Sequence, residues 1–384
     1  MTDRIYIFAG GGTGGHLYPG LAVAEELTRI EPGAKIVFAC SNREIDRRIL
    51  GPQPYAMVPQ PIRPLPAGPL GWWAFAKAYL QSAAQSRDMV RDLKPAAVLG
   101  LGGFAAWPLV SRAARSGVPS AMLNPDAVPG KANKRLAGLA DAIFTQFERT
   151  AERFPPALRG KVRAVGCPIR PGLLGASRET AVRHFEIDGS LKTLLVFGAS
   201  LGAATINEAM VALAPDLRQF AGKWQVLHVA GAGKGQGLGD AYKSAGIAAR
   251  GMEYCDRMEL AYAVADLALC RSGAGTVAEL LATATPAVLM PYPYHRDRQQ
   301  THNAQPLADA GTAVICEDAR DAAANAAILR EHLLPLMQDE GALAKMRRSA
   351  AGIGKPYAAR DVAQWLVQNG RPAFRGQAAD SQRK

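Results

Sequence analysis

The hydrophobic positions in the first 165 residues form short apolar runs that alternate with amphipathic stretches. The runs at 5–9, 34–40 and 96–101 contain β-branched or aromatic residues, as expected for strands that are buried on both faces. Glycine or polar residues end each run, and a helical pattern follows. This alternation predicts an α/β domain that is built on a parallel sheet.

The second half of the chain repeats the pattern after a segment rich in proline and glycine. Its apolar runs are 192–197, 224–229, 267–270 and 287–291. We therefore predict two Rossmann-like domains with parallel sheets, which suits a chain of 384 residues. The expected parts are an N-terminal domain at 1–165, a linker at 166–172, a second domain at 173–355, a helix at 356–370 that packs back on the first domain, and a disordered tail at 371–384.

A glycine loop ends the first predicted strand. Five of the six residues from Gly10 to Gly15 are glycine, Thr13 is the exception, and His16 follows the loop. We predict that Pro19 opens the next helix, where its missing N–H is not needed. Such a loop bares backbone N–H groups at a helix N-terminus, which suits phosphate. A tight turn explains only two or three of the glycines, so we expect the loop to face a phosphate or a sugar.

The end of the second strand argues against a dinucleotide site. A Rossmann unit that binds NAD carries an acid there for the ribose. This chain has Ser41, Asn42 and Arg43 instead, and the arginine leaves only NADP formally open. The sequence therefore favours a different ligand for the glycine loop.

Composition narrows the class of protein. Apolar residues make up 48% and charged residues 20%, which is typical of a globular chain. No apolar run predicts a transmembrane helix and no signal peptide is visible, so we expect a protein that stays in the cytoplasm. The five cysteines lack zinc or disulfide spacing and are expected to be reduced. Since the chain also has no Asp-x-Asp triplet to clamp a metal on a diphosphate, we expect no metal and no other cofactor.

The net charge of +12 is uneven along the chain. Residues 1–165 hold 21 Lys and Arg against 12 Asp and Glu, so this half alone carries +9. A basic half attracts a phosphorylated substrate, an anionic phospholipid surface or nucleic acid. Because no zinc module or RNA-binding signature is visible, nucleic acid is not an expected partner.

An aromatic cluster follows a proline-rich segment at 52–71, which we expect to be an irregular loop or edge. Trp72, Trp73 and Phe75 lie in a helical pattern close to Lys77. Two adjacent tryptophans point to different sides of a helix, so the rings cannot all face one core. The cluster is either a wide buried face or a surface patch that enters a membrane interface, with Lys77 near the lipid headgroups.

Two further features carry candidate chemistry, each with a structural alternative. In 270–279 a strand, a glycine loop and a helix follow one another, and Thr276 and Glu279 have the spacing of a capping box. The functional interpretation is that the helix start faces a diphosphate while Glu279 accepts hydrogen bonds from ribose hydroxyls. Arg170, within the linker, either reaches a ligand or is an exposed linker charge.

The segment 292–303 is dense in hydrogen-bonding side chains. Gln299, Gln300 and Asn303 lie at helical spacing, so at least two of these amides share a face, and the alternative is a solvated helix start. Open α/β sheets bind ligands at the carboxyl ends of their strands. The strand ends that could converge on one cleft are at His16, 102–104 and 124–126.

Together these motifs resemble the MurG family, the undecaprenyl-diphospho-muramoylpentapeptide β-N-acetylglucosaminyltransferases of glycosyltransferase family 28. The resemblance covers residues 4 to 368, and its motifs are 11–24, 102–104, 166–170, 198–203, 271–279 and 297–300. It implies a GT-B fold with the active site in the cleft between the domains. It also implies inverting transfer of N-acetylglucosamine from UDP-N-acetylglucosamine to the C4 hydroxyl of the muramoyl sugar of lipid I, which gives lipid II for peptidoglycan synthesis.

The resemblance further implies where the enzyme works and which residues bind the donor. The protein would be peripheral on the cytoplasmic face of the inner membrane, with the lipid acceptor on the basic N-terminal domain and the patch Trp72, Trp73 and Phe75 in the membrane surface. The implied donor contacts are Thr13, Gly14 and Gly15 in the first loop, Arg170 and Ser200 at the diphosphate and hinge, Cys255 beside the uracil, Ala274, Gly275, Thr276, Val277, Ala278 and Glu279 around the uridine, and Gln299 and Gln300 at the N-acetylglucosamine hydroxyls.

The chain departs from the family pattern near the predicted chemistry. Asn124 replaces a glutamate that is sometimes considered for catalysis, Asp126 replaces an asparagine that touches the donor, and Leu201 replaces a glutamine. His16 is the first candidate for the catalytic base, because its ordinary pKa suits neutral pH. Asp126 is the second, and the alternative role for His16 is to orient a phosphate or a sugar hydroxyl.

Two other functions are compatible with the same residues. A transferase of the same fold that acts on another lipid acceptor, such as diacylglycerol, would share the donor half. A nucleotide-sugar-binding protein without catalytic activity would share the nucleotide contacts and lack the base.

Overall fold

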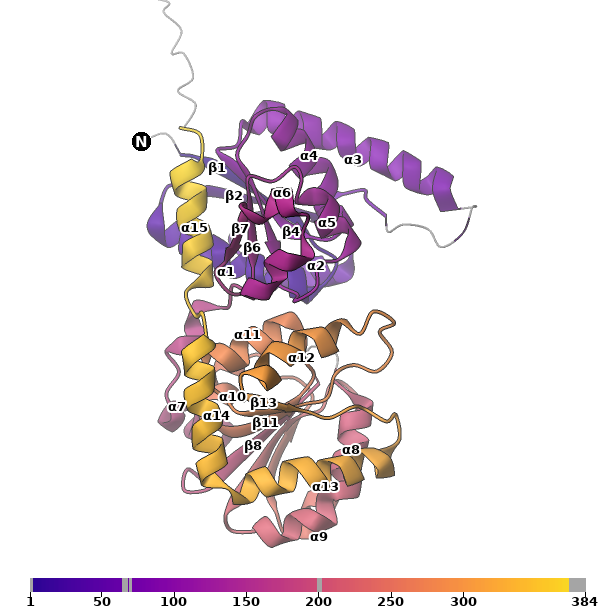
Figure 1. Ribbon diagram of the computed structural model, residues 1–384, viewed down its shortest axis with the longest axis vertical. Coiled ribbons are helices and arrows are strands. Elements are labelled where there is room, and N and C mark those ends of the chain that lie inside the picture. Colours follow the sequence, from indigo (N-terminus) through magenta and orange to yellow (C-terminus); the bar gives the residue numbers. More distant parts are fainter. Residues whose placement is uncertain (1–2, 64–67, 69–70, 199–201, 373–384) are drawn as a thin grey trace, which may run out of the picture. The chain divides into compact units, whose positions relative to one another are not determined.

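The computed structural model describes residues 3–63, 68, 71–198 and 202–372, and these form two compact units (Figure 1). Unit 1 comprises Met1–Pro125, Pro129–Pro168 and Tyr357–Lys384, and unit 2 comprises Asp126–Val128 and Ile169–Pro356. Each unit contains one parallel sheet with helices on its faces. The prediction of a two-domain α/β fold is therefore confirmed.

Unit 1 is built on a seven-stranded sheet in the order β3-β2-β1-β4-β5-β6-β7. Its strands are β1 (Ile5–Gly10), β2 (Lys35–Ser41), β3 (Ala56–Gln60), β4 (Ala97–Gly102), β5 (Ser120–Asn124), β6 (Ala142–Thr145) and β7 (Val162–Ala164). Its helices are α1 (Gly14–Ile30), α2 (Glu44–Leu50), α3 (Trp72–Leu93), α4 (Trp107–Arg115), α5 (Lys131–Leu136), α6 (Pro156–Arg159) and α15 (Ala358–Asn369), with 3₁₀ turns at Phe104–Ala106 and Glu148–Arg153.

Alternating side chains of β1 show how both faces of this sheet are buried. Tyr6 and Phe8 pack in one core with α1, α2 and α15, whereas Ile7 and Ala9 pack in another with α3, α4 and α5. All four side chains are fully buried. Helices on both faces thus account for the continuous apolar run in the sequence.

Two prolines of unit 1, Pro19 and Pro59, lie within regular elements. The segment 52–71 forms no α-helix in its described residues, and Pro59 lies in β3 at the sheet edge, where a missing N–H is tolerated. The prediction that Pro19 opens the first helix is wrong, because α1 already begins at Gly14 and contains Pro19. The Thr13 carbonyl accepts hydrogen bonds from the backbone N–H groups of His16 and Leu17, so the helix starts within the glycine run.

Unit 2 is built on a six-stranded sheet in the order β10-β9-β8-β11-β12-β13. Its strands are β8 (Lys192–Phe197), β9 (Trp224–Val229), β10 (Ala248–Met252), β11 (Ala265–Cys270), β12 (Ala287–Leu289) and β13 (Ala313–Ile315). Its helices are α7 (Arg178–Phe185), α8 (Ala204–Leu217), α9 (Leu238–Ala245), α10 (Met258–Val264), α11 (Ala274–Ala282), α12 (Gln299–Asp309), α13 (Ala322–Gln338) and α14 (Glu340–Ile353), with 3₁₀ turns at Pro171–Leu174 and Arg218–Phe220.

The strand order places a topological switch point at the centre of each sheet. In unit 1 the first strand β1 lies between β2 and β4, and in unit 2 the first strand β8 lies between β9 and β11. The connections leave such a central pair in opposite directions, which opens a crevice at the carboxyl ends of the two strands. In each unit the loops at this crevice are therefore the candidate site.

Candidate active site

The glycine loop of unit 1 is held by a buried carboxylate. Asp46 in α2 is fully buried and accepts hydrogen bonds from the Gly12 N–H (2.7 Å), the Ser41 N–H (2.9 Å) and the Ser41 hydroxyl (2.6 Å). A Cβ on Gly11 would lie 2.4 Å from Asp46 Oδ2. The loop is therefore too close to the carboxylate for any residue other than glycine at position 11. Because charge-assisted bonds of this kind are strong, the shape of the loop is fixed without a ligand.

His16 lies against the turn that follows β4. A Cβ on Gly102 would be 3.1 Å from His16 Cδ2, and Gly102 and Gly103 have φ angles of 107° and 74°, which glycine adopts with little strain. The hydroxyl oxygen of Thr13 is 3.2 Å from His16 Nδ1. When Nδ1–H donates to this oxygen, the neutral ring carries its lone pair on Nε2.

Asn124, which replaces the family's glutamate, is buried and forms a hydrogen-bonded pair with a second amide. Its Oδ1 accepts a hydrogen bond from Asn133 Nδ2 at 2.9 Å, and the same nitrogen donates to the Leu123 carbonyl at 3.3 Å. Asn133 Oδ1 is buried, has no hydrogen-bond partner among the described residues, and would lie 3.5 Å from a Cβ on Gly102. The turn at Gly102 and Gly103, which contacts His16, therefore packs next to the Asn124–Asn133 amide pair.

In unit 2, Glu279 does not cap the start of its own helix. Gly273 is the N-cap of α11 and makes no side-chain cap, and Thr276 is already inside the helix, so the capping-box interpretation is wrong. Glu279 Oε2 instead accepts a hydrogen bond from the Tyr262 hydroxyl at 3.0 Å. Burial raises the pKa of Glu279 above its usual value, while Arg170 and the bond from Tyr262 partly lower it. The carboxylate keeps lone pairs for hydroxyl donors of a ligand.

Arg170 and Cys255 lie in the same region as Glu279. Burial raises the pKa of the Cys255 thiol, and the positive charge of Arg170 opposes that change. The side chains of Val277 and Ala278 are buried, so these two positions offer a ligand only backbone groups. Ser200 and Leu201 lie outside the described residues.

A buried ion pair joins the strand ends of unit 2. Arg271 follows β11, and its guanidinium donates to Asp318 Oδ2 (2.8 Å), the Thr205 hydroxyl (2.7 Å) and the Met290 carbonyl (2.8 Å). Burial alone would raise the pKa of Asp318. Hydrogen bonds from Thr205, Asn325 and Arg271 nevertheless keep this pKa below its usual value. This network ties the start of α8 to the ends of β11 and β12.

Gln299 and Gln300, the two predicted sugar-binding amides, differ in their hydrogen bonds to the rest of the protein. Gln300 Oε1 accepts hydrogen bonds from the N–H groups of Tyr292 (2.9 Å) and Ser272 (3.3 Å), so only its amide nitrogen is left for a ligand. Gln299 is the first residue of α12, and its backbone N–H donates to Asp297 Oδ1 at 3.3 Å. Its side chain makes no hydrogen bond among the residues that the structure describes.

Asp126 and Asn303 form a pair within unit 2. Asn303 is buried in α12, its Nδ2 donates to Asp126 Oδ1 at 2.9 Å, and its Oδ1 accepts from the Ala127 N–H at 2.8 Å. The Asp126 carboxylate therefore has a structural partner, which makes it a poorer candidate base than His16. The structure groups His16 with unit 1 and Asp126 with unit 2.

The aromatic cluster lies at the start of α3, which extends beyond the sheet of unit 1 (Figure 1). Trp73 is 82% exposed and Trp72 is 52% exposed, so the interpretation as a wide buried face is wrong for the tryptophans. Phe75 is half-buried between Trp72 and Tyr79, with ring centroids 5.7 Å and 6.4 Å away.

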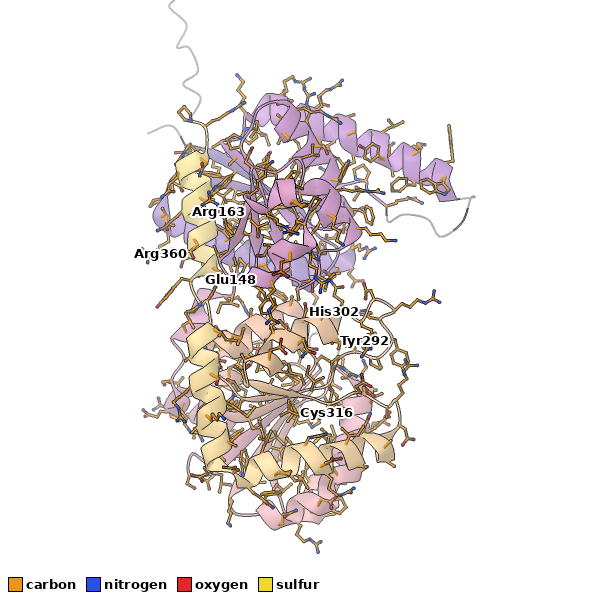
Figure 2. The ribbon with its side chains drawn as sticks, in the orientation of Figure 1. Glu148, Arg163, Tyr292, His302, Cys316 and Arg360 are labelled. Atoms are coloured by element: carbon orange, nitrogen blue, oxygen red, sulfur yellow. The ribbon has the colours of Figure 1, made fainter. Side chains whose placement is uncertain are left out.

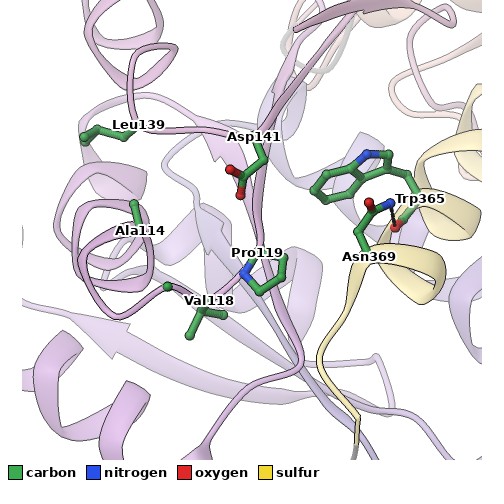
Figure 3. Close-up of a pocket in the computed structure, with 8 residues that line it drawn as sticks. Ala114, Val118, Pro119, Leu139, Asp141, Trp365 and Asn369 are labelled. Carbon is green, nitrogen blue, oxygen red and sulfur yellow. Dashed lines mark hydrogen bonds between the residues drawn. The ribbon is translucent and has the colours of Figure 1, made fainter.

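A cavity of about 430 Å³ in unit 1 is lined by none of these residues. Figure 3 shows the side chains that line it. Trp365, Pro119 and Asp141 line it, close to the amino ends of β5 and β6. The glycine loop and His16 are at the opposite, carboxyl edge of the sheet. This cavity is therefore not part of the candidate active site.

Comparison with known proteins gives the family. Residues 6–145 match the glycosyltransferase family 28 N-terminal domain, and residues 193–363 match its C-terminal domain. The UDP-N-acetylglucosamine–N-acetylmuramyl-(pentapeptide) pyrophosphoryl-undecaprenol N-acetylglucosamine transferase of Halothermothrix orenii is 35% identical over 92% of this chain and 95% of its own. The transferase of the same name from Leifsonia xyli is 36% identical over 91% of this chain and 94% of its own.

The chain belongs to this transferase family. Among solved structures, Acinetobacter baumannii MurG has a TM-score of 0.75 and 26% identity, and the alignment covers 95% of this chain and 99% of that one. A UDP-GlcNAc 2-epimerase from Neisseria meningitidis, 15% identical with a TM-score of 0.66 over 95% of this chain and all of that one, shares the fold alone. The predicted GT-B fold and glycosyltransferase class are confirmed.

Several residues that shape the candidate site are not marked by any local pattern in the sequence. Asp46 stands just beyond the strand end at which an acid would bind ribose, and its partner Gly12 is 34 positions away. Tyr262 and Asn133 sit in ordinary amphipathic patterns, and only their hydrogen bonds show what they hold. Arg271 is the exception, because an arginine at the end of an apolar run is a visible signal for a buried or ligand-facing charge.

Proposed function

We propose that this protein transfers N-acetylglucosamine from UDP-N-acetylglucosamine to the C4 hydroxyl of the muramoyl sugar of lipid I, forming lipid II. The main support for the proposal is the position of the Glu279 carboxylate, together with the membership of the chain in this family. Its carboxylate is held by Tyr262 near Arg170 and keeps lone pairs for ribose hydroxyls. The names of the relatives supply the donor sugar and the acceptor.

The donor diphosphate would face the helix starts of unit 2. The first turns of α8 and α11 place the positive ends of two helix dipoles at the carboxyl edge of the sheet, and Arg170 adds a full positive charge. These groups offset the negative charge that develops on UDP as the bond to the sugar breaks. Gln299 and the amide nitrogen of Gln300 would orient the sugar hydroxyls.

His16 would act as the catalytic base. The C4 hydroxyl oxygen attacks the anomeric carbon, its proton passes to His16 Nε2, and UDP leaves with the bonding electron pair. Attack from the side opposite the leaving group inverts the anomeric carbon. The support for this role is the position of the ring on the Gly102–Gly103 turn, with Thr13 at Nδ1 to set the tautomer.

The exposed aromatic side chains of α3 would bind the membrane that carries the acceptor. No helix among the described residues meets the length and hydropathy needed to cross a bilayer. Trp72, Trp73 and Leu80 nevertheless expose apolar surface next to Lys77, a combination that suits an interface rich in anionic phospholipid. The working location would be the cytoplasmic face of the inner membrane, as a peripheral protein.

A transfer assay tests the proposal. Labelled UDP-N-acetylglucosamine is offered with lipid I and, in parallel, with diacylglycerol. The expected result is labelled product from lipid I alone. Product from diacylglycerol alone would replace the acceptor assignment, and UDP binding without product in either arm would make the chain a binding protein.

A further inference from the structure

A second cavity lies in unit 2, beside the predicted sugar-binding amides. It has a volume of about 470 Å³ and is formed by the loop after β12 and the loop after β13. The residues that line it are Pro291, Tyr292, Pro293, Tyr294, His295, Arg296, Arg298, Thr301, Ile315, Glu317, Asp318 and Arg320. Figure 2 marks Tyr292 on the first of these loops. None of the donor contacts implied by the family resemblance is among these residues.

The cavity wall has more arginine side chains than carboxylates that could pair with them. The Asp318 carboxylate is committed to Arg271, and Glu317 pairs with Arg298 at 2.8 Å. Arg296 is exposed and has no partner among the described residues, while Arg320 donates to the Pro293 carbonyl at 2.7 Å and has no carboxylate partner there. Two guanidinium groups are therefore available to an anion.

Aromatic and proline side chains form the rest of the wall. The Tyr292 and Tyr294 rings are 5.3 Å apart, and the guanidinium of Arg320 lies 4.8 Å from the Tyr294 ring centroid. Both tyrosines are largely exposed. Flat apolar surfaces beside guanidinium groups suit a peptide with a carboxylate, because rings contact its backbone and side chains while arginine binds its charge.

The cavity wall is next to Gln300, one of the two amides predicted to bind the sugar. The Tyr292 N–H donates to Gln300 Oε1, and Thr301 lies in the cavity wall one residue beyond Gln300. The glycine loops and helix starts that suit phosphate belong to other parts of the unit, after β8 and β11. A ligand here would thus be joined to the sugars rather than to the nucleotide.

We propose that this cavity binds the peptide of the acceptor, with Arg296 and Arg320 holding its carboxylate. The inference rests on the proposed function, because the relatives are named for an acceptor that carries a pentapeptide. A peptide linked through its amino end to the muramoyl sugar keeps a free C-terminal carboxylate. Arg296 and Arg320 are therefore determinants of acceptor specificity, and they take no part in the chemical step.

The kinetic test uses the full protein with Arg296→Ala, Arg320→Ala and the double variant. Arg183→Ala is the control, because Arg183 is an exposed arginine of the same unit that pairs with Glu179 in its own helix. We expect KM for lipid I to rise about tenfold in the double variant, with kcat and KM for the donor nearly unchanged. Unchanged acceptor KM in both single variants and the double variant would overturn the proposal.

A binding test separates this proposal from the transfer activity. The probe is soluble N-acetylmuramyl-pentapeptide, observed by ligand-detected NMR, beside the same compound with a C-terminal amide and beside inorganic pyrophosphate. The wild-type protein should bind the acid, and both the amide and the double variant should lose that binding. Equal binding of acid and amide, or displacement by pyrophosphate, would overturn the carboxylate site even if transfer is confirmed. If lipid I is not a substrate, the proposed function fails while this measurement still decides what the cavity binds.

Discussion

Unit 1 and unit 2 each place a carboxylate near the carboxyl edge of the sheet, and the two carboxylates have different surroundings. Asp46 is fully buried, and its oxygens accept hydrogen bonds from Gly12 and Ser41. Glu279 is half-buried and accepts a bond from Tyr262. A carboxylate whose lone pairs are filled by the protein shapes the backbone, whereas one with lone pairs to spare is available to a ligand.

The histidines of the two units repeat this contrast. His228 in unit 2 is fully buried, with Nδ1 2.8 Å from the Tyr242 hydroxyl and Nε2 3.0 Å from Asn207 Oδ1. Burial lowers the pKa of His228 to about 4, so it is neutral near pH 7. His16 in unit 1 is half-buried on a glycine turn at the edge where ligands bind. The same residue type thus serves the core in one unit and, in our proposal, the reaction in the other.

The largest effect should come from His16→Ala. Without a base in the transition state, kcat is expected to fall about 10²–10⁴-fold, while KM for the donor changes little. His184→Gln, an exposed histidine of unit 2, is the control. Steady-state kinetics measure both constants, and full turnover by the His16 variant would remove this residue from the chemistry.

Asp46→Asn should chiefly weaken folding. The amide keeps the size of the carboxylate, but its NH₂ group would meet the N–H donors of Gly12 or Ser41, so the free energy of unfolding should drop by about 2–4 kcal/mol. Urea denaturation gives this value, with the exposed Asp92→Asn as a matched control. A loss equal to that of the control would mean that the loop keeps its shape without the charge.

Glu279→Gln should weaken donor binding without loss of fold. Replacing a charged acceptor costs about 1.5–3 kcal/mol, which corresponds to a rise in donor KM of about 10- to 100-fold. Burial raises the pKa of Glu279, so in the wild type protonation begins at a higher pH than for a free carboxyl group. Donor affinity should therefore fall as the pH is lowered toward the raised pKa, and the glutamine variant should lack this dependence. The same pH profile in both proteins would contradict the ribose assignment.

The smallest effect concerns acid stability, which should distinguish the two units. The unfolded chain binds a proton at His228 near pH 6.5, whereas folded unit 2 does so only near pH 4, so stability is lost as pH falls through this window. The loss should reach about 1 kcal/mol one pH unit below the unfolded pKa. Hydrogen exchange at falling pH should show β9 of unit 2 opening before β1 of unit 1. Equal protection of both strands would show that another group sets acid sensitivity.

The sequence predicts the sheets well for a physical reason. Parallel strands covered on both faces require continuous apolar runs, and β1, β4, β8 and β11 all have them. Glycine runs at strand ends then locate the switch points, since only a tight turn can bring a helix back onto the sheet there. Patterns that are local in the chain therefore carry most of the fold.

The candidate site was harder to predict because its hydrogen bonds span long distances in the chain. Thr276 and Glu279 have the spacing of a capping box, but the N-cap of α11 is Gly273, and the Glu279 carboxylate bonds to the Tyr262 hydroxyl from 17 residues away. Asn124 stands where the family has a glutamate, and its side-chain oxygen accepts a hydrogen bond from Asn133, nine residues away. Such competition is decided by tertiary packing, which no local pattern records.

Calorimetric titration of UDP into the His16→Ala and Glu279→Gln variants tests the division of labour between the units most directly. If unit 1 supplies the base and unit 2 the donor site, the His16 variant should bind UDP like the wild type although it forms almost no product. The Glu279 variant should bind UDP about 10- to 100-fold more weakly. Weakened UDP binding in the His16 variant, or unchanged binding in the Glu279 variant, would contradict the account.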